Sequence, residues 1–189
     1  MYENLSEKRK QELETLKIWA ECAGDSYYFS MDQSTFEQNM KGCEGEEFFK
    51  AYLRQRKIGL EEFANEISSQ ITSIHNSEEL HYLLDGYNYD SGNWTVMQCL
   101  NHSCCDIRTA RMVYWLLCPD YYYDTYTDLE HIPESDINVK NSKVLKFIEE
   151  KALSQGFVYS LTSEYEDEEV PSPNEYVGRI PDSLFVGED

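Results

Sequence analysis

The chain has 189 residues, of which 41% are hydrophobic and 14% aromatic, enough apolar side chain for one packed domain. Its formal net charge of −20 comes from 36 acidic and 16 basic residues, so nucleic acid and anionic lipid would repel it. No stretch approaches the roughly 18 consecutive apolar residues of a membrane-spanning helix, and the polar N-terminal segment lacks a signal-peptide core. We therefore expect a cytoplasmic protein with six reduced cysteines.

Apolar residues recur at helical spacing along most of the chain. This spacing predicts helices over residues 5–22, 45–56 and 60–74, a shorter one near 35–40, and another that Ser77 caps. A further helix is predicted from Asn93, and the next runs over residues 107–117, with Asp106 as its cap and Pro119 at its end. Because residues 107–117 are apolar around most of the circumference, we place that helix in the core. The last long helix is predicted over residues 143–155.

These elements predict an all-α fold of stacked helical hairpins, because no long alternating strand pattern occurs. We expect one helical domain over residues 1–159, and an irregular acidic C-terminal extension over residues 160–189. Two prolines, Pro171 and Pro173, favour extended chain in that extension. Its end is apolar enough to fold back onto the helical domain through Ile180, Leu184, Phe185 and Val186.

Two segments hold most of the negative charge. Residues 119–136 carry six carboxylates and no lysine or arginine, and residues 160–189 carry nine carboxylates against Arg179 alone. The first segment is also rich in tyrosine, which offers a large contact area beside carboxylates that steer a cationic partner. We therefore predict a partner-binding surface formed by Asp120, Tyr121, Tyr122, Tyr123, Asp124, Tyr126 and Asp128. The competing interpretation is that these charges form a solvated face and the tyrosines cover the core.

A second pattern occupies residues 80–117, which read LHYLLDGYNYDSGNWTVMQCLNHSCCDIRTARMVYWLL. Its distinctive positions are Tyr87, Asn88, Asp90, Gly92, His102, Cys105, Asp106, Thr109, Ala110, Tyr114 and Trp115. The stretch, within a core of about residues 78–118, resembles an uncharacterised bacterial domain family with a Tyr-Asn-x-Asp-x-Gly loop, a short helix, His-x-x-Cys-Asp, and Thr-Ala with an aromatic pair. Ser103 departs from the family, which often has proline there. The resemblance implies a helical fold and no established reaction. Because members resembling it occur beside secreted toxin systems, it also implies an immunity role.

The residues of this motif have structural explanations. Asn88 and Asp90 are turn residues, Gly92 permits a positive φ, and Asp106 caps the helix that follows. The alternative is an enzyme pocket around Asn88, Asp90, His102 and Asp106, because a histidine–carboxylate pair is the minimum for proton transfer. The sequence contains neither a G-x-S-x-G nucleophile motif nor a glycine-rich phosphate loop. We interpret the motif as a folding signature.

Metal binding is the remaining chemical alternative. Thiolate and imidazole ligands occur together at Cys99, His102, Cys104 and Cys105, but their spacing differs from that of the usual zinc sites. The acidic loop near Asp90 lacks the twelve-residue calcium pattern and its terminal glutamate. We therefore predict no metal and no cofactor.

The favoured function is non-enzymatic: a bacterial immunity-type protein that binds and neutralises a basic protein toxin. A nuclease suits this interpretation, because its active-site face must attract phosphate and a carboxylate-rich surface can cover that face. The alternatives are the small enzyme described above and a regulatory or scaffold module that displays its tail. The expected partner is a basic protein, not nucleic acid or a membrane. The sequence does not indicate an oligomeric state.

Overall fold

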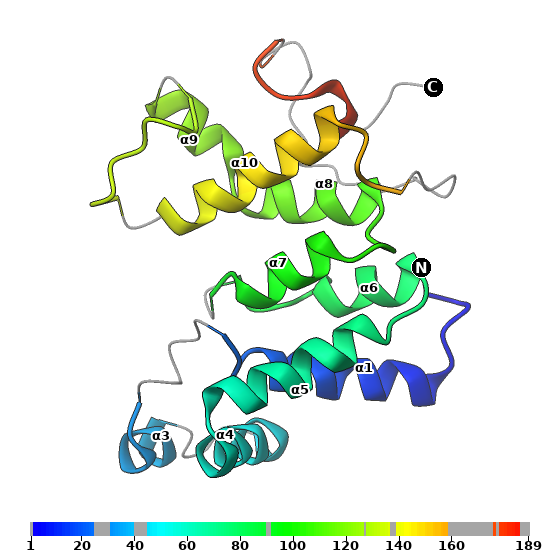
Figure 1. Ribbon diagram of the computed structural model, residues 1–189, viewed down its shortest axis with the longest axis vertical. Helices are drawn as coiled ribbons and strands as arrows, with labels where there is room; N and C mark the ends of the chain where they lie inside the picture. The colour runs from blue at the N-terminus through cyan, green and yellow to red at the C-terminus, as the bar shows by residue number, and fades with distance from the viewer. Residues whose placement is uncertain are drawn as a thin grey trace. The chain divides into compact units, whose positions relative to one another are not determined.

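The chain is helical along most of the part that the structure describes (Figure 1). The computed structural model describes residues 2–24, 31–39, 45–89, 92–126, 128–136, 139–158, 176 and 178–185. The predicted all-α fold is confirmed, because these residues form helices and loops with a single isolated β-bridge. None of the helices in these ranges combines the length and the apolar character that crossing a lipid bilayer requires.

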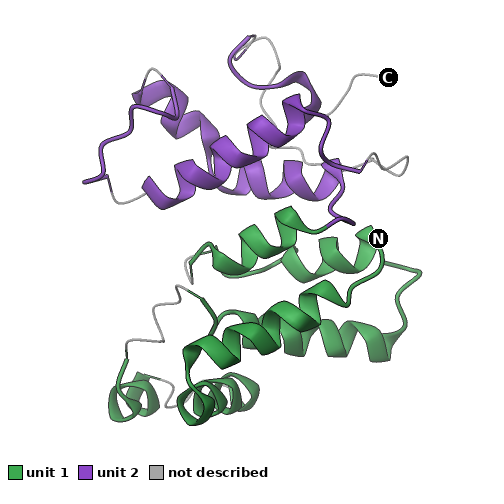
Figure 2. Ribbon diagram, viewed as in Figure 1, with its two compact units in different colours: residues 1–102 green, residues 103–189 purple. Residues whose placement is uncertain are grey.

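The chain divides into two compact units, residues 1–102 and residues 103–189 (Figure 2). Unit 1 contains α1 (Glu7–Ala20), α3 (Gln33–Asn39), α4 (Glu46–Ile58), α5 (Leu60–Thr72), α6 (Ser77–Leu84) and α7 (Trp94–Asn101). Unit 2 contains α8 (Ile107–Leu116), α9 (Pro119–Thr125), α10 (Val139–Leu153) and the short 3-10 helix η3 (Asp182–Leu184). The predicted boundary between a helical domain and an extension at residue 159 stays a prediction.

Unit 1 is organised around α1, which contacts α4, α5 and α6. The Ser6 side chain caps α1 by accepting a hydrogen bond from the Arg9 amide at 3.2 Å. From there the helix buries Leu13 and Leu16 in the core of the unit. The hairpin of α4 and α5 turns at Gly59, whose φ of 90° is a conformation that residues with a side chain rarely adopt.

The later helices of unit 1 show how the local sequence sets the chain path. Asn76 caps α6 by accepting a hydrogen bond from the Glu79 amide at 2.9 Å, so the predicted cap, Ser77, is instead the first residue of the helix. Gly24, in the loop after α1, has a φ of 65°, and a Cβ atom there would lie 2.2 Å from the Trp94 side chain. Glycine at this position therefore permits the close approach of the loop to α7.

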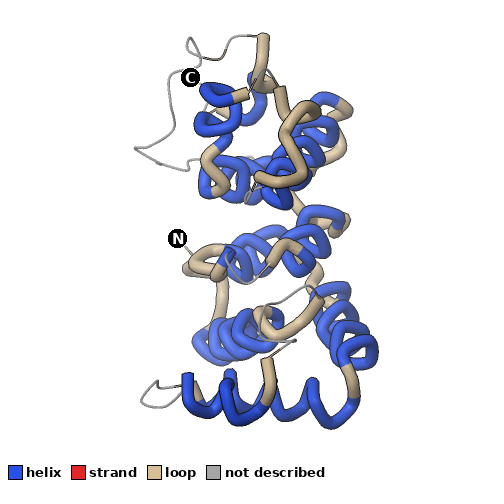
Figure 3. Tube along the Cα trace, turned by 90° about the vertical axis from the view of Figure 1, so that its left-hand side faces the viewer, coloured by secondary structure: helices blue, strands red, loops and turns tan. Residues whose placement is uncertain are grey.

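Unit 2 is organised around α8, which contacts α10 and η3. Asp106 caps α8 as predicted, because its Oδ1 accepts hydrogen bonds from the amide and the hydroxyl of Thr109 at 2.8 and 2.7 Å. A parallel β-bridge pairs Asp106 with Val158, which lies in the loop after α10. Helices and loops make up the rest of the described trace (Figure 3). The predicted burial of α8 is observed along most of its length.

Pro119 begins a helix as well as ending one. Cys118 adopts a left-handed conformation with a φ of 52°, and α9 starts at the next residue. Proline suits the first position of a helix because it has no amide to leave unpaired and its φ is already helical. α8 therefore ends before Pro119 as predicted, whereas the helix α9 that begins there was not predicted.

The last described segment packs onto unit 2. Ile180, Leu184 and Phe185 are buried, and Leu184 is 0% exposed. The indole of Trp115 donates a hydrogen bond to the Leu184 carbonyl at 2.8 Å, and the Arg111 guanidinium donates one to the Ser183 carbonyl at 2.7 Å. The end of the predicted extension is therefore part of the unit 2 core, whereas Val186 and the carboxylates of residues 160–175 lie outside the described residues.

Candidate functional site

The predicted partner-binding surface divides into exposed and buried residues. Tyr122 and Tyr123, 2% and 7% exposed, lie in the core of unit 2. The cause is α9: its helical period turns these two side chains inward, whereas the sequence prediction treated all the tyrosines of this segment as surface anchors. Both side chains are therefore corrected from surface anchors to core positions, although Tyr123 also lines the cavity described below. The remaining positions, which we call the Tyr/Asp face, are Asp120, Tyr121, Asp124, Tyr126 and Asp128.

Hydrogen bonds hold the two tyrosines of the Tyr/Asp face in place. The Tyr126 hydroxyl donates a short hydrogen bond to Asp136 Oδ2, and the Tyr121 hydroxyl lies 3.5 Å from the same oxygen. The bond to Asp136 raises the pKa of Tyr126 to about 12, so its hydroxyl stays protonated at neutral pH. Tyr121 remains 42% exposed. The face therefore presents an aromatic ring that is already oriented, which lowers the entropy lost on binding.

Asp128 closes the Tyr/Asp face with a turn. Its Oδ1 accepts hydrogen bonds from the backbone amides of Glu130 and His131 at 2.8 and 3.0 Å, and lies 2.8 Å from His131 Nδ1. The His131 side chain and these amides lower the pKa of Asp128. The carboxylate is therefore ionised across the neutral range.

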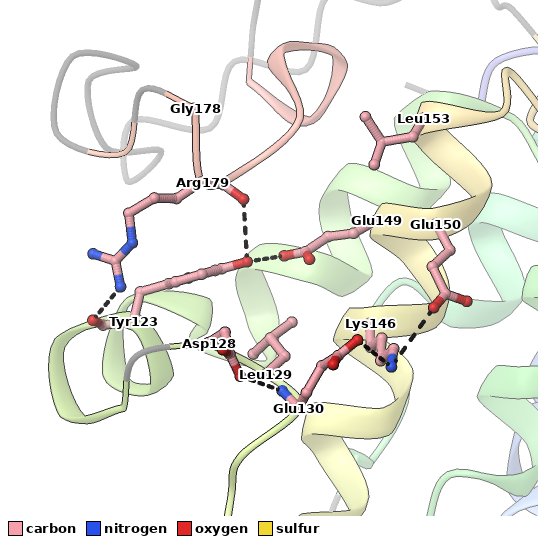
Figure 4. A pocket seen from close by; sticks show the side chains of 10 residues that line it. All are labelled: Tyr123, Asp128, Leu129, Glu130, Lys146, Glu149, Glu150, Leu153, Gly178 and Arg179. Carbon is pink, nitrogen blue, oxygen red and sulfur yellow. Dashed lines mark hydrogen bonds and ion pairs between the residues drawn. The ribbon is translucent and has the colours of Figure 1, made fainter.

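An open cavity of about 400 Å³ lies beside Asp128 (Figure 4). Its wall carries four carboxylates against one lysine and one arginine, with two leucines beside them. The lining residues are Tyr123, Asp128, Leu129, Glu130, Lys146, Glu149, Glu150, Leu153, Gly178 and Arg179. α9, the turn at 128–130, α10 and the C-terminal segment thus all contribute to one acidic concavity within unit 2.

Glu149, on α10, is the central carboxylate of this cavity. Its Oε1 accepts a short hydrogen bond from the Tyr114 hydroxyl and a second one from the Tyr123 hydroxyl at 2.7 Å. Burial raises the pKa of Glu149, and the two hydroxyl donors oppose that rise. Within the described part of the chain, no group donates a hydrogen bond to the other oxygen, Oε2. One oxygen is therefore fixed by the fold, and the other is available to a ligand.

Arg179 forms the wall opposite Glu149. Its guanidinium carbon lies 4.7 Å from the centre of the Tyr123 ring, and its Nη2 donates a hydrogen bond to the Tyr123 carbonyl at 2.6 Å. The Tyr123 hydroxyl in turn lies 3.3 Å from the Arg179 carbonyl, as Figure 4 shows. The single basic residue of the acidic extension is thereby tied to the tyrosine that also holds Glu149.

Lys146 partly neutralises the rim of the cavity. Its ammonium lies 2.9 Å from Glu130 Oε1 and 3.8 Å from Glu150 Oε1. The two glutamates are largely exposed and the Lys146 side chain is 40% exposed, so water and salt screen these pairs. Glu149 forms no ion pair with any residue that the structure describes.

Sequence reasoning missed Glu149 and Arg179. In the sequence, Glu149 is one of several charged residues on the polar face of the predicted helix over residues 143–155. Arg179 is an isolated cation in an acidic extension. Neither residue belongs to a motif. The only available signal was the combination of a carboxylate inside a helix and apolar residues near the C-terminus that were expected to fold back.

The residues of the family-like motif are distributed over both units. In unit 1, Tyr87 is buried, Asn88 is exposed, and Gly92 has the positive φ, 113°, that its role in the loop predicts. Asp90 lies outside the described residues. His102 is half-buried just after α7, where its amide donates a hydrogen bond to the Cys99 carbonyl at 3.1 Å. In unit 2, Cys105 and Asp106 are buried and Trp115 is half-buried.

The structure does not bring the predicted enzyme pocket together within one unit. Asn88 and His102 belong to unit 1, and Asp106 belongs to unit 2. Asp106 is also 0% exposed, and its Oδ1 is used in capping α8. The structure therefore adds no geometric support to the catalytic alternative.

Three of the five cysteines that the structure describes are core residues, whereas Cys104 is half-buried and Cys118 is exposed. Cys22, Cys99 and Cys105 are buried, and burial raises the pKa of Cys22 and that of Cys105 to about 12. Such thiols stay protonated at neutral pH, whereas metal binding and nucleophilic attack need the thiolate. Among the described residues, no group of three or more histidine, cysteine, aspartate or glutamate side chains is arranged to hold a metal ion.

Comparison with known proteins gives one match. No curated protein and no solved structure matches the chain. Residues 75–153 match the family model described as Domain of unknown function (DUF4274). The matched range contains the whole stretch 80–117 and reaches the cavity-lining part of α10. The resemblance to an uncharacterised domain family is thereby confirmed.

Proposed function

We propose that the protein acts by binding a basic protein partner through the Tyr/Asp face and the adjoining cavity of unit 2. The observation that supports this proposal is the state of the carboxylates there. Asp120 and Asp124 are exposed and form no ion pair with any described residue. Glu149 accepts hydrogen bonds from two tyrosine hydroxyls, which orient its carboxylate without cancelling its charge, and it forms no ion pair with a described residue. The face therefore keeps its negative potential.

The two residue types of the face have separate roles in this proposal. Exposed aspartates attract a cationic partner over distance and raise the association rate, which falls again as salt screens the charges. Tyr121 supplies a rigid aromatic contact once the partner is bound. Replacement of an aspartate is thus expected to slow association, and replacement of Tyr121 to speed release.

The concrete form of the proposal is a bacterial immunity-type protein that acts in the cytoplasm and neutralises a basic toxin. A nuclease fits this role, because the cationic face that attracts nucleic acid phosphates would also attract the Tyr/Asp face, and the bound protein would exclude the substrate. The association of similar family members with toxin systems, implied by the resemblance of residues 80–117, supports the same role.

The test is co-expression with the toxin that a neighbouring gene encodes. We expect the wild-type chain to restore growth, and the triple variant Asp120→Lys, Asp124→Lys, Asp128→Lys to fail, because its face would repel the partner. A matched variant with Glu3→Lys, Glu37→Lys and Glu61→Lys makes the same charge change on exposed carboxylates of unit 1 and should still restore growth. Circular dichroism checks that both variants are folded. Equal rescue by the Asp→Lys variant would remove the Tyr/Asp face from the function.

A further inference from the structure

The cavity beside the Tyr/Asp face has the polar and apolar parts of a receptor for one long cationic side chain. Its volume of about 400 Å³ is open to solvent on one side. Its carboxylates outnumber its cations by four to two, so a bound cation would be attracted overall. Leu129 and Leu153 supply apolar wall. Leu153 is 72% exposed at the rim, and Figure 4 shows it on the opposite side of the opening from Gly178 and Arg179.

Glu149 gives this cavity a directed acceptor. Both tyrosine hydroxyls bind Oε1, which fixes the plane of the carboxylate and leaves Oε2 without a donor among the described residues. A carboxylate that is partly withdrawn from water binds a cation more strongly than one on an open surface. Its raised pKa reports the same cost of burial, which a cationic ligand would offset.

Arg179 shows which cation the opposite wall accommodates. The chain's own guanidinium lies over the face of Tyr123 and donates to a backbone carbonyl at the edge of the cavity. This packing is characteristic of the planar guanidinium, which stacks on aromatic rings and donates several hydrogen bonds in one plane. Arg179 itself occupies the Tyr123 face and carbonyl, so an incoming cation has to bind at the carboxylates on the other side of the cavity.

The arrangement favours arginine over lysine as the incoming group. Carboxylates line the cavity from different elements: Glu149, whose Oε2 has no donor among the described residues, is on α10, and Asp128, whose two oxygens lie 2.8 and 2.9 Å from His131 Nδ1, is in the turn after α9. The five donors of a guanidinium satisfy acceptors that lie in different directions, whereas an ammonium group is a compact point charge that keeps its water. The methylene stem of arginine also covers apolar surface of the kind that Leu129 and Leu153 provide.

We propose that the cavity receives one arginine side chain of the basic partner, with the guanidinium bound to Glu149 Oε2 and the stem packed on Leu129 and Leu153. This inference rests on the proposed function and names the chemical group that the site recognises. It makes Glu149 the specificity-determining residue of unit 2, next to the steering aspartates of the Tyr/Asp face.

The experiment titrates the full chain with acetylated, amidated Gly-Gly-Arg-Gly and follows binding by NMR. Two control peptides replace arginine by citrulline, which keeps the shape without the charge, and by lysine, which keeps the charge without the planar fork. We expect the arginine peptide to shift signals of Glu149 and Leu153, and the citrulline peptide to bind about tenfold more weakly. Equal binding of the arginine and lysine peptides, or of the arginine and citrulline peptides, would overturn the inference.

Variants of the chain test the same contact from the other side. Glu149→Gln keeps an acceptor for both tyrosines and removes the charge, and we expect it to weaken arginine-peptide binding about tenfold. Glu134→Gln removes the same charge from an exposed position outside the cavity and should change binding by about twofold or less. Leu153→Ala truncates a side chain at the exposed rim and cannot disturb the core, so it keeps the test decisive if Glu149→Gln fails to fold. We expect it to weaken binding measurably. Unchanged affinity in both Glu149→Gln and Leu153→Ala would overturn the inference.

The outcomes separate this inference from the proposed function. Suppose that the neighbouring toxin binds the Glu149→Gln variant as tightly as the wild type but no longer binds the triple Asp→Lys variant. The cavity inference then fails, and the partner-binding function stands. If the arginine peptide binds the cavity and the Asp→Lys variant still protects cells, the inference stands and the proposed surface fails.

Discussion

The two units carry the same number of carboxylates and hold them differently. Unit 1 has 18 acidic and nine basic residues, and unit 2 has 18 acidic and seven basic residues. Among the described residues of unit 1, seven glutamates form ion pairs with lysine or arginine; Arg9, for example, binds Glu79 at 2.7 Å, and Arg54 binds Glu66 across the α4–α5 hairpin. In unit 2 Lys146 pairs with Glu130 and Glu150, whereas Glu149 accepts hydrogen bonds from two tyrosine hydroxyls and forms no ion pair with a described residue.

This difference shows that the number of acidic residues does not by itself define an acidic surface. An arginine or lysine partner orients a carboxylate and cancels its charge. A tyrosine hydroxyl orients it and leaves the charge in place. The paired glutamates of unit 1 therefore contribute to the stability of its fold, whereas Asp120, Asp124 and Glu149 of unit 2 keep their negative charge.

The strongest way to break the comparison is to remove the C-terminal packing of unit 2. Leu184→Ala deletes a side chain that is 0% exposed, and we expect it to destabilise the unit by about 2–5 kcal/mol. Amide hydrogen exchange measures the effect separately in α8, α10 and the helices of unit 1. Protection should fall in unit 2 and persist in α1, and Leu153→Ala, at the exposed rim, should change neither. An equal loss of protection in both units would contradict this division of the fold.

The next test removes one of the hydroxyls that hold Glu149. Tyr114→Phe leaves the core volume nearly unchanged and deletes the donor to Oε1, so we expect a loss of about 1–2 kcal/mol in the free energy of unfolding at neutral pH. The pKa of Glu149 should rise further, because one of the two groups that lower it is gone. Carbon-13 NMR of the carboxyl group measures that pKa directly. An unchanged pKa would show that the hydroxyl does not stabilise the ionised form.

The pH dependence of stability sharpens the same point with a smaller effect. Burial places the pKa of Glu149 above the ordinary glutamate value of 4.5, so the fold disfavours the ionised form. As the pH falls from 7 through the raised pKa toward 4.5, the wild type should gain stability relative to Glu149→Gln, which has no charge to lose. Urea unfolding of both proteins across this range measures the difference. If the difference in unfolding free energy between the wild type and Glu149→Gln did not change with pH, the burial of an ionised Glu149 would be contradicted.

The smallest expected effect concerns the ion pairs of unit 1. Arg9→Ala removes the partner of Glu79, and we expect a loss of about 1 kcal/mol or less, because the Arg9 side chain is partly exposed to solvent. The loss should shrink further in high salt, which screens the pair. Thermal unfolding at two salt concentrations checks both statements. A loss as large as that of Leu184→Ala would show that ion pairs contribute far more to unit 1 than the comparison allows.

Helical periodicity and capping made most of the fold predictable. The predicted helices match α1, α4, α5, α8 and α10 to within a few residues, and Asp106 caps α8 as expected. The sequence did not identify Asn76 as the cap of α6, because Asn76 and Ser77 are adjacent and both have side chains that favour the capping position. α9 was missed because Pro119 was interpreted only as a stop. A proline followed by an acidic first turn, here Asp120, is also the signature of a helix start.

Only the part of the candidate site whose residues are close together in the sequence could be predicted. The clustered charge of residues 119–136 indicated the Tyr/Asp face. The inward turn of Tyr122 and Tyr123 follows from α9, so missing that helix also misplaced these side chains. The cavity depends on Glu149 and Arg179, which tertiary packing brings to Tyr123 from 26 and 56 residues away. No local pattern encodes such contacts, because each residue alone is an ordinary surface charge.

The central claim is that the Tyr/Asp face attracts a cationic partner, and the association rate constant tests it most directly. Stopped-flow mixing of the full chain with the toxin that a neighbouring gene encodes would measure this constant at several salt concentrations. If the face attracts the partner over distance, association of the wild type should be fast at low salt and should slow steeply as salt rises. Association of the Asp120→Lys, Asp124→Lys, Asp128→Lys variant should be at least about tenfold slower and nearly independent of salt. Equal rates and equal salt dependence for the wild type and this variant would contradict the claim.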